Sequence, residues 1–538
     1  MAQQEATPER PNIILIMADD MGFSDIGCYG SEIQTPNLDA MAASGVRFTQ
    51  MYNNARCCPT RASLLTGLYA HQAGIGHMVG DYGIPEYQGY LREDCVTIAE
   101  ALKAGGYRTL MSGKWHVGGS YNPLAPETWD PGGPGHPTPR QRGFDRYYGT
   151  LDGAGSYFHP HTMLEDDTVV TPESADGRFY YTDEISNHAV SMIEDAAAEK
   201  SAHDDTPFFL YVGYTAPHWP LHALPEDIAK YEGLYRKGGW DGLRTARHEE
   251  MKGLGLVSDR WDISPRDGEA PSWEDVKARD WEDLRMAVYA AQIDRMDQGI
   301  GAILAKLDEL GLTENTLVMF LADNGGCAEF LAEDGWCQRY ATQTPDGKPI
   351  RTGNTVDVRP GGRDTFMSYD LPWANASNAP FRLYKHWVHE GGISTPLIVR
   401  WPKVIEVSRI EHTVCHVIDL MATCLDAADV KYPSEHGGHS ITPPAGESFV
   451  PALVAEGWRR EAPVFWEHEG NRAVRDGRWK LVNRYPGEWE LYDMVDDRTE
   501  LNDLSGVNEP QVAAMIDQYT GWAERCRVRD WPVGPEAG

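Results

Sequence analysis

The sequence has no long apolar run. No stretch approaches the roughly 18 consecutive apolar residues that a membrane-spanning helix needs. The first apolar segment is Ile13–Met17, and the residues before it are mostly polar. That segment is too short to be the core of a signal peptide. We therefore expect a cytoplasmic protein with no membrane partner.

Positive charge is also scarce. Lys and Arg together number 48 and Asp and Glu number 81, so the formal net charge is −33. A surface of this sign repels phosphate backbones, which argues against a nucleic-acid partner. It does not exclude an anionic small molecule, because a binding site can be positive locally.

Cysteine is sparse and odd in number. Nine cysteines in 538 residues do not make the disulfide framework of a small secreted domain. Any special cysteine is therefore expected to be a chemical group rather than a structural link. Hydrophobic residues make up 41% of the chain, which is enough for a large packed core and excludes a disordered protein.

Apolar runs alternate with helical patterns over most of the chain, which predicts an α/β fold with a mostly parallel sheet. The predicted strands are residues 12–18, 109–111, 208–212 and 316–322, and the predicted helices begin at 36, 97 and 281. The segments 118–142 and 325–380 are rich in Gly, Pro, Asp and Asn. They are predicted to be long loops, either binding loops or insertions without a role.

The pattern changes near residue 456. Short strand patterns separated by turns are followed by a helical pattern, at residues 463–467, 472–475, 479–483, 490–492 and 511–522. We predict a large α/β domain over residues 1–455 and a small α+β subdomain, an antiparallel sheet with a helix, over 456–538.

Two predicted strands end in oxygen-bearing side chains. Asp19 and Asp20 follow the first strand, and Asp323 and Asn324 follow strand 316–322. Ligands collect at the carboxyl ends of parallel strands. Three carboxylates and an amide without His or Cys favour Ca²⁺ or Mg²⁺ over Zn²⁺. The alternative interpretation is that both pairs are helix caps or turn residues.

A cysteine-rich segment begins a predicted helix. Cys57 and Cys58 precede Pro59, a residue suited to a first helical position, and Arg61 follows. The helix N-terminus and the guanidinium would both attract a tetrahedral oxyanion. The alternatives are a buried structural cysteine with a surface arginine, or a redox-active cysteine pair.

The eleven residues from Cys57 to Gly67 (CCPTRASLLTG) resemble the signature of the type I sulfatases, C-x-P-x-R followed by x-x-x-T-G. Further motifs of that family are matched in order along nearly the whole chain, and the overall pattern is most similar to bacterial arylsulfatases. The matching residues are Asp19, Asp20, Lys114 and His116 in GKWH, His218 in APH, Asp323, Asn324, and Lys385 ahead of EGG at 390–392.

The resemblance implies an alkaline-phosphatase-like fold and hydrolysis of a small-molecule sulfate ester to an alcohol and sulfate. It implies that a separate maturation enzyme converts Cys57 to formylglycine (3-oxoalanine). It also implies one Ca²⁺ per chain, with Mg²⁺ as second choice, held by Asp19, Asp20, Asp323, Asn324 and residue 57. The long loop 325–380 is where we expect the departures that set substrate choice.

The resemblance also implies a mechanism. A hydroxyl of the hydrated aldehyde, deprotonated with help from Asp323, attacks sulfur, and His116 then serves as the base that releases sulfate. Lys114 and Arg61 bind the sulfate, while His218 and Lys385 assist the leaving oxygen. Without the signature these four Lys and His residues would be read as ordinary surface or loop side chains. We expect Arg61→Ala and Lys385→Ala to cripple turnover and leave the fold intact.

Three other functions stay open at this point. One is a phosphonate monoester hydrolase or phosphodiesterase on the same scaffold, since its site would also hold a tetrahedral anion. Another is a phosphatase with two zinc ions, which the all-oxygen pairs disfavour. The last is a calcium-binding module with an unmodified Cys57. The natural sulfate ester and the oligomeric state are not encoded in any motif of the sequence.

Overall fold

The computed structural model describes residues 10–172, 179–203, 206–340 and 342–534, and for 199–203 it describes the backbone alone. The outer limits of the two predicted domains, residues 1 and 538, lie outside this part of the chain. Within it, no helix combines the length and the apolar content that crossing a membrane requires.

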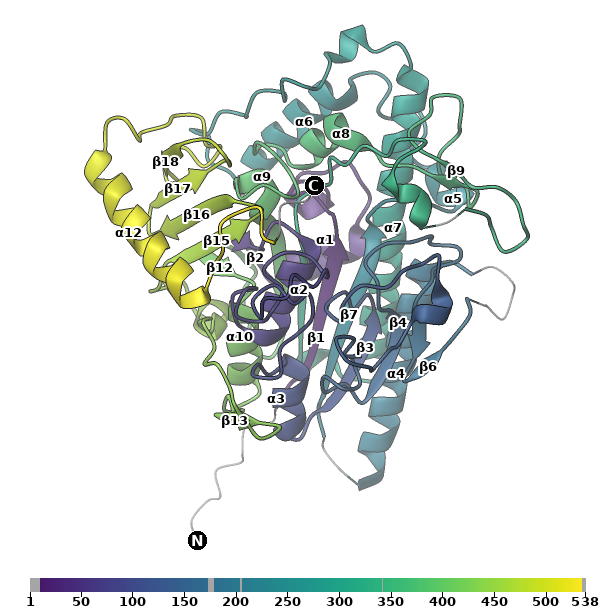
Figure 1. Cartoon of the computed structure of the whole chain (residues 1–538), viewed down its shortest axis with the longest axis vertical. Coiled ribbons are helices and arrows are strands. Elements are labelled where there is room, and N and C mark those ends of the chain that lie inside the picture. The colour runs from purple at the N-terminus through teal and green to yellow at the C-terminus, as the bar shows by residue number, and fades with distance from the viewer. Residues whose placement is uncertain (1–9, 173–178, 204–205, 341, 535–538) are drawn as a thin grey trace.

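The largest element is a mixed, mostly parallel sheet of ten strands (Figure 1). β1 lies inside it and pairs in parallel with both β7 and β8. β11 and β5 run antiparallel to both of their neighbours, and the edge strand β6 runs antiparallel to β5. In spatial order the strands are β12 (Arg409–His416), β2 (Val46–Tyr52), β11 (Ser394–Arg400), β8 (Thr316–Ala322), β1 (Asn12–Asp19), β7 (Phe208–Pro217), β3 (Arg108–Gly113), β4 (Arg146–Thr150), β5 (Met163–Glu165) and β6 (Thr168–Val169).

Helices cover both faces of this sheet. Successive side chains of a buried strand point to opposite faces, so both faces are apolar and each needs a covering layer. Ile14 and Ile16 of β1 pack into the core under α1 (Pro36–Ala43), α4 (Tyr181–His203), α6 (Gly239–Gly253), α7 (Arg279–Glu309) and α8 (Asp370–Ser377). Leu15 and Met17 pack into the opposite core under α2 (Cys57–Thr66), α3 (Ile98–Ala104), α10 (Asp419–Ala427) and α11 (Val450–Val454).

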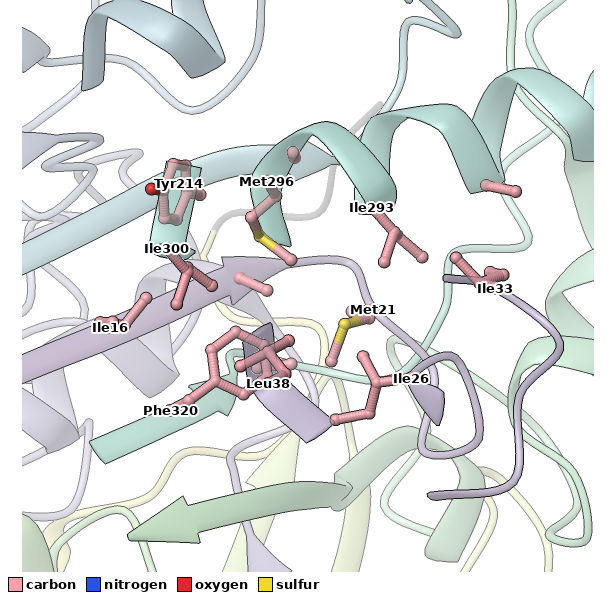
Figure 2. Close-up of a cluster of buried hydrophobic side chains, with 14 of the residues drawn as sticks. Ile16, Met21, Ile26, Ile33, Leu38, Tyr214, Ile293, Met296, Ile300 and Phe320 are labelled. Carbon is pink, nitrogen blue, oxygen red and sulfur yellow. The ribbon is translucent and has the colours of Figure 1, made fainter. Parts of the chain in front are cut away.

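Figure 2 shows part of the first core. Ile16 of β1 and Phe320 of β8 face a row of α7 side chains one or two turns apart, together with Leu38 of α1. The α7 side chains in this row are Ile293, Met296 and Ile300. Full burial of an aliphatic side chain contributes about 1.5–3 kcal/mol. This packing therefore holds the carboxyl ends of β1 and β8 in fixed positions.

The predicted elements are confirmed with small shifts at their ends. Strand 316–322 matches β8, and the helix predicted from 281 is α7, which begins two residues earlier. Thr97 caps α3 through a capping box with Glu100. One detail was wrong: α2 begins at Cys57, so Pro59 is its third residue and not its first. The strands β2, β11 and β12 and helix α4 were not predicted.

The C-terminal part is a four-stranded antiparallel sheet with one long helix. One face of the sheet packs on α12 (Glu509–Cys526), which lies along its outer side in Figure 1, through residues such as Leu481 and Trp522. The other face packs on Tyr52 and Ile393 of the central sheet region. The strands are β15 (Val464–His468), β16 (Asn471–Asp476), β17 (Trp479–Asn483) and β18 (Trp489–Asp493). A domain boundary at residue 456 stays a prediction.

The two predicted loops differ in content. The segment 118–142 is a loop with one short 3-10 turn. The segment 325–380 also holds the small parallel ladder of β9 (Arg351–Thr352) with β10 (Thr365–Phe366), and α8. α8 packs against α6, and its Ser377 carbonyl accepts a hydrogen bond from Ser24 near the end of β1. This loop is therefore anchored on the main core.

Candidate active site

Four oxygen-bearing side chains meet at the carboxyl ends of β1 and β8. The parallel register pairs Ala18 with Ala322, so the residues that follow them lie side by side. The Asp20 amide donates to Asp323 Oδ1 at 3.2 Å, and Asn324 Nδ2 donates to Asp20 Oδ1 at 2.7 Å. Asp19 and its three partners are all buried. The structure therefore brings together the four predicted oxygen ligands.

Cys57 is the first residue of α2 and is 2% exposed. A hydrogen bond with Cys58 is the largest of the effects that lower the pKa of the Cys57 thiol well below its usual range. The Lys114 ammonium acts in the same direction. The charge of Cys57 in turn acts on the carboxyls of Asp19 and Asp323. Residue 57 therefore lies within the electrostatic reach of the oxygen cluster.

Two cations lie beneath the cluster. Arg61 Nε and Nη2 donate to Asp323 Oδ2 at 3.1 and 2.8 Å, and Nη1 donates to the Lys114 carbonyl at 3.1 Å. Lys114 follows β3, and its ammonium donates to Asp19 Oδ2. Arg61, Lys114 and their two carboxylate partners have no exposed surface. Buried charges require such pairing, because an unpaired charge in the interior is costly.

His116 lies on the Cys57 side of the site. Its Nε2 is 3.2 Å from Cys58 Sγ, and its Nδ1 has no hydrogen-bond partner among the described residues. Donor atoms of Cys57, Cys58 and His116 all lie within 4.8 Å of one another. Burial lowers the pKa of His116 to about 4, so the ring is neutral at pH 7 and can take up a proton.

His218 and Lys385 form the opposite side. His218 Nδ1 donates to the Trp219 carbonyl at 2.6 Å, which leaves Nε2 as the acceptor. That Nε2 is 3.4 Å from Lys385 Nζ, and the ammonium contacts Asp20 Oδ2 at 2.9 Å. Burial lowers the pKa of His218 to about 4. Burial alone would lower the pKa of Lys385, but Asp20, Cys327 and Glu329 together outweigh it and hold that pKa well above its usual range.

The oxygen cluster fits a hard cation. Asp19 Oδ1 and Asn324 Oδ1 are buried and have no hydrogen-bond partner within the described part of the chain. Burial raises the pKa of Asp19 to about 6 and that of Asp323 well above its usual range. Carboxylates crowded in this way require positive charge. Oxygen donors of carboxylates and an amide are the ligands that Ca²⁺ and Mg²⁺ prefer.

Several contacting residues were missed by the sequence analysis. Tyr211 of β7 contacts Arg61 Nη1 through its hydroxyl at 3.2 Å. Trp219 lies beside His218, with ring centroids 4.4 Å apart, and donates to Glu329 at 2.7 Å. No motif signals these residues, although Trp219 follows His218 directly. Cys58 was considered only as part of a redox pair, and its contact with His116 was not foreseen.

The Glu-Gly-Gly motif has a structural role. The backbones of Gly325 and Gly391 approach so closely that a Cβ on Gly325 would lie 2.0 Å from the Gly391 carbonyl oxygen. Glu390 is fully buried and pairs with Lys480 at 2.9 Å and Arg498 at 2.8 Å. The motif therefore closes the loop behind Asp323 and Asn324 and connects it to the C-terminal sheet.

Known proteins share this arrangement of sequence and fold. The sulfatase family model matches residues 11–430, and that of the C-terminal region of N-sulphoglucosamine sulphohydrolase matches 381–525. The chain is 33% identical to the arylsulfatase of Klebsiella aerogenes, over 85% of this chain and 95% of that protein. It is 32% identical to an uncharacterized sulfatase of Schizosaccharomyces pombe, over 96% of this chain and 94% of that protein.

Solved structures agree on the fold. The crystal structure of Ps i-CgsB superposes with a TM-score of 0.66 at 25% identity, over 96% of this chain and 93% of that one. Together with the family match, the ten-stranded sheet and its helical layers identify the predicted alkaline-phosphatase-like architecture. The chain therefore belongs to the sulfatase family and is a sulfuric ester hydrolase.

Proposed function

We propose that this protein is an arylsulfatase that hydrolyses sulfate monoesters, ROSO₃⁻ and water giving ROH and sulfate, with formylglycine at position 57 and one Ca²⁺. The observation that carries the proposal is the position of Cys57. It begins a buried helix beside Lys114 and His116, and its charge acts on the carboxyls of Asp19, Asp20 and Asp323. Asp19, Asp20, Asp323 and Asn324, together with residue 57, would hold the ion.

The modification must precede folding. Cys57 is 2% exposed, and every residue of α2 is buried. A maturation enzyme cannot reach a thiol in that position, so we propose that it acts on the signature of the unfolded chain. Formylglycine at position 57 would supply a hydroxyl nucleophile, and the cation would supply positive charge to the sulfate oxygens.

Side chains of the protein itself then stabilise charge and transfer protons. Arg61 and Lys114 supply fixed positive charge where negative charge spreads over the sulfate oxygens. His116 is neutral and has an unpartnered Nδ1, so it can accept the proton that must be removed before sulfate departs. His218 accepts from Lys385, so the pair can deliver a proton to the leaving oxygen.

Aromatic side chains support an aryl leaving group. Trp219 adjoins His218 and packs against Trp336, Tyr340 and Phe366 at centroid distances of 5.4, 5.6 and 5.8 Å. Trp336 is 49% exposed, so apolar surface is available to a ligand beside the leaving-group side. These three rings come from the long loop 325–380, where the sequence analysis expected substrate choice to be set.

Turnover of a chromogenic aryl sulfate tests the proposal. Wild-type protein with Ca²⁺ should release the phenol, while Cys57→Ala protein and wild-type protein with a chelator should not. The alternative, a phosphonate monoester hydrolase, is tested by comparing kcat/KM for matched aryl sulfate and aryl phosphonate esters. A higher kcat/KM for the phosphonate would refute the arylsulfatase assignment.

A further inference from the structure

A second group of metal-binding side chains lies outside the catalytic cluster. It consists of His386, His468 and Glu469, which we call the hairpin cluster. His386 follows Lys385 in the loop before α9 (Glu390–Ile393), His468 ends β15, and Glu469 lies in the β15–β16 turn. Donor atoms of the three side chains all lie within 4.8 Å of one another.

The spacing of these atoms suits a small tetrahedral ion. Glu469 Oε2 is 2.9 Å from His386 Nδ1, and Glu469 Oε1 is 3.6 Å from His468 Nε2. Ligands bound to Zn²⁺ at about 2.0–2.1 Å in tetrahedral geometry are separated by about 3.3 Å. The observed separations lie on both sides of that value, so small side-chain movements would complete the geometry.

His468 provides the strongest sign of a missing partner. Its ring is buried, with a side-chain exposure of 1%, and neither ring nitrogen has a hydrogen-bond partner within the described residues. An unsatisfied buried polar group costs about 1–3 kcal/mol.

A neighbouring histidine holds the carboxylate in place. His77 Nε2 donates to Glu469 Oε1 at 2.8 Å, and the Tyr82 hydroxyl donates to His77 Nδ1 at 3.0 Å. The rings of His77 and His468 are stacked, with centroids 5.6 Å apart. Outer hydrogen bonds of this kind orient the ligands of protein metal sites.

We propose that the hairpin cluster binds one Zn²⁺ ion, separate from the hard-cation site of Asp19 and Asp323. Two imidazoles and one carboxylate favour zinc over calcium or magnesium. Three protein ligands leave one coordination position open. His386 also lines a cavity of about 290 Å³ shared with Arg56 and Lys385, which borders the cluster on the His386 side.

The ion would link two parts of the fold. His468 and Glu469 belong to the hairpin of the C-terminal sheet, whereas His386 belongs to the loop that carries Lys385. The two parts already contact each other through the His386–Glu469 pair and through the pairs of Glu390 with Lys480 and Arg498, and the ion would add a further link. Zinc bound at the hairpin cluster therefore stabilises the folded chain by mass action. This inference does not depend on the proposed sulfatase reaction.

Zinc retention by the full-length protein tests the proposal. Chelator-treated protein is saturated with Ca²⁺, incubated with Zn²⁺, passed through a desalting column and analysed for metal content. We expect one zinc per chain in wild type and in the control variant His439→Ala. His439 is half-exposed and is not part of the hairpin cluster. His386→Ala and Glu469→Gln should lose the bound zinc, and His77→Ala should weaken its affinity about 10–100-fold.

Co²⁺ substitution locates the ion. Cobalt at the hairpin cluster should give weak ligand-field bands with no thiolate charge-transfer band, because its ligands are nitrogen and oxygen. A thiolate band would place the ion at Cys57 or Cys58 and overturn the proposal. Failure of wild type to retain zinc, or retention that survives both His386→Ala and Glu469→Gln in folded protein, would do the same.

Discussion

Arg61 and Asp323 form a buried ion pair in which two guanidinium nitrogens donate to the same carboxylate oxygen, at 3.1 and 2.8 Å. Neither side chain has exposed surface. The pair connects two elements of the site. α2 begins with Cys57, and Asp323, a member of the oxygen cluster, directly follows β8. Residue 57 and the oxygen cluster are thereby fixed relative to each other.

Arg61→Ala should therefore impair both activity and stability. Loss of a charged donor to the sulfate lowers kcat about 10²–10³-fold. Breaking the buried pair costs about 3–5 kcal/mol of unfolding free energy, which replaces the sequence-based expectation of an intact fold. Kinetics and denaturant unfolding measure the two effects. Arg61→Lys, which keeps the charge but not the planar fork, should be intermediate, and an Arg61→Ala protein of wild-type stability would contradict the geometry.

Lys385→Ala should affect poor leaving groups most. In the proposed mechanism Lys385 and His218 assist the departing oxygen, so their removal should lower kcat/KM about 10²–10⁴-fold for an alkyl sulfate. The loss should be much smaller for 4-nitrophenyl sulfate, whose phenolate leaves without a proton. The matched control is His116→Ala, which acts after the leaving group has departed. Equal losses for all esters in Lys385→Ala would refute the role in leaving-group departure.

Acid should destabilise the fold through His222. Its Nε2 donates to the Thr365 carbonyl at 2.6 Å, and burial lowers its pKa to about 3 from an ordinary value of 6.5. The unfolded chain therefore binds the proton more tightly. The contribution of the neutral His222 ring to the free energy of unfolding is complete above pH 6.5. It is lost as the pH falls toward 3, by at most about 1.4 kcal/mol per pH unit.

Denaturant unfolding of wild type and His222→Gln between about pH 5 and 7 measures this effect. The pH slope should be smaller in His222→Gln, because the glutamine amide does not titrate. His439→Gln serves as the control for a half-exposed histidine. Identical slopes for His222→Gln and wild type would show that His222 does not titrate as described.

Glu390→Gln should destabilise the protein with little effect on KM. Glu390 pairs with Lys480 and Arg498, all of which are fully buried. Loss of its charge leaves two buried cations sharing fewer anions, at a cost of about 3–5 kcal/mol of unfolding free energy. Thermal unfolding together with KM at a permissive temperature tests this. A large rise in KM at unchanged stability would show that the Glu-Gly-Gly motif has a direct role in substrate binding.

The sequence predicted those parts of the molecule whose signals are local. The apolar run 316–322 predicted β8, and the helical periodicity from residue 281 predicted α7. Both patterns can be recognised within a short window of sequence. The ten site residues could be named because each stands in a motif. Lys385 contacts Asp20, and the Asp20 amide donates to Asp323, but the catalytic roles of these residues stay a proposal.

Contacts between distant segments could not be predicted. β11 pairs with β2 through residues more than three hundred positions apart, and β2 shows no simple alternation. The same holds for the hairpin cluster, where His386 meets Glu469 only because the C-terminal sheet packs against the central one. Neither pairing leaves a signal within a single window of sequence.

The central claim is that an aldehyde at position 57, and not the thiol, performs the reaction. Preparations with different degrees of conversion can be compared by peptide mass spectrometry over residues 57–61 and by kcat for an aryl sulfate with Ca²⁺ present. We predict that kcat per chain rises in proportion to the aldehyde fraction and extrapolates to zero at zero conversion. Full activity in protein whose Cys57 is still a thiol would contradict the account.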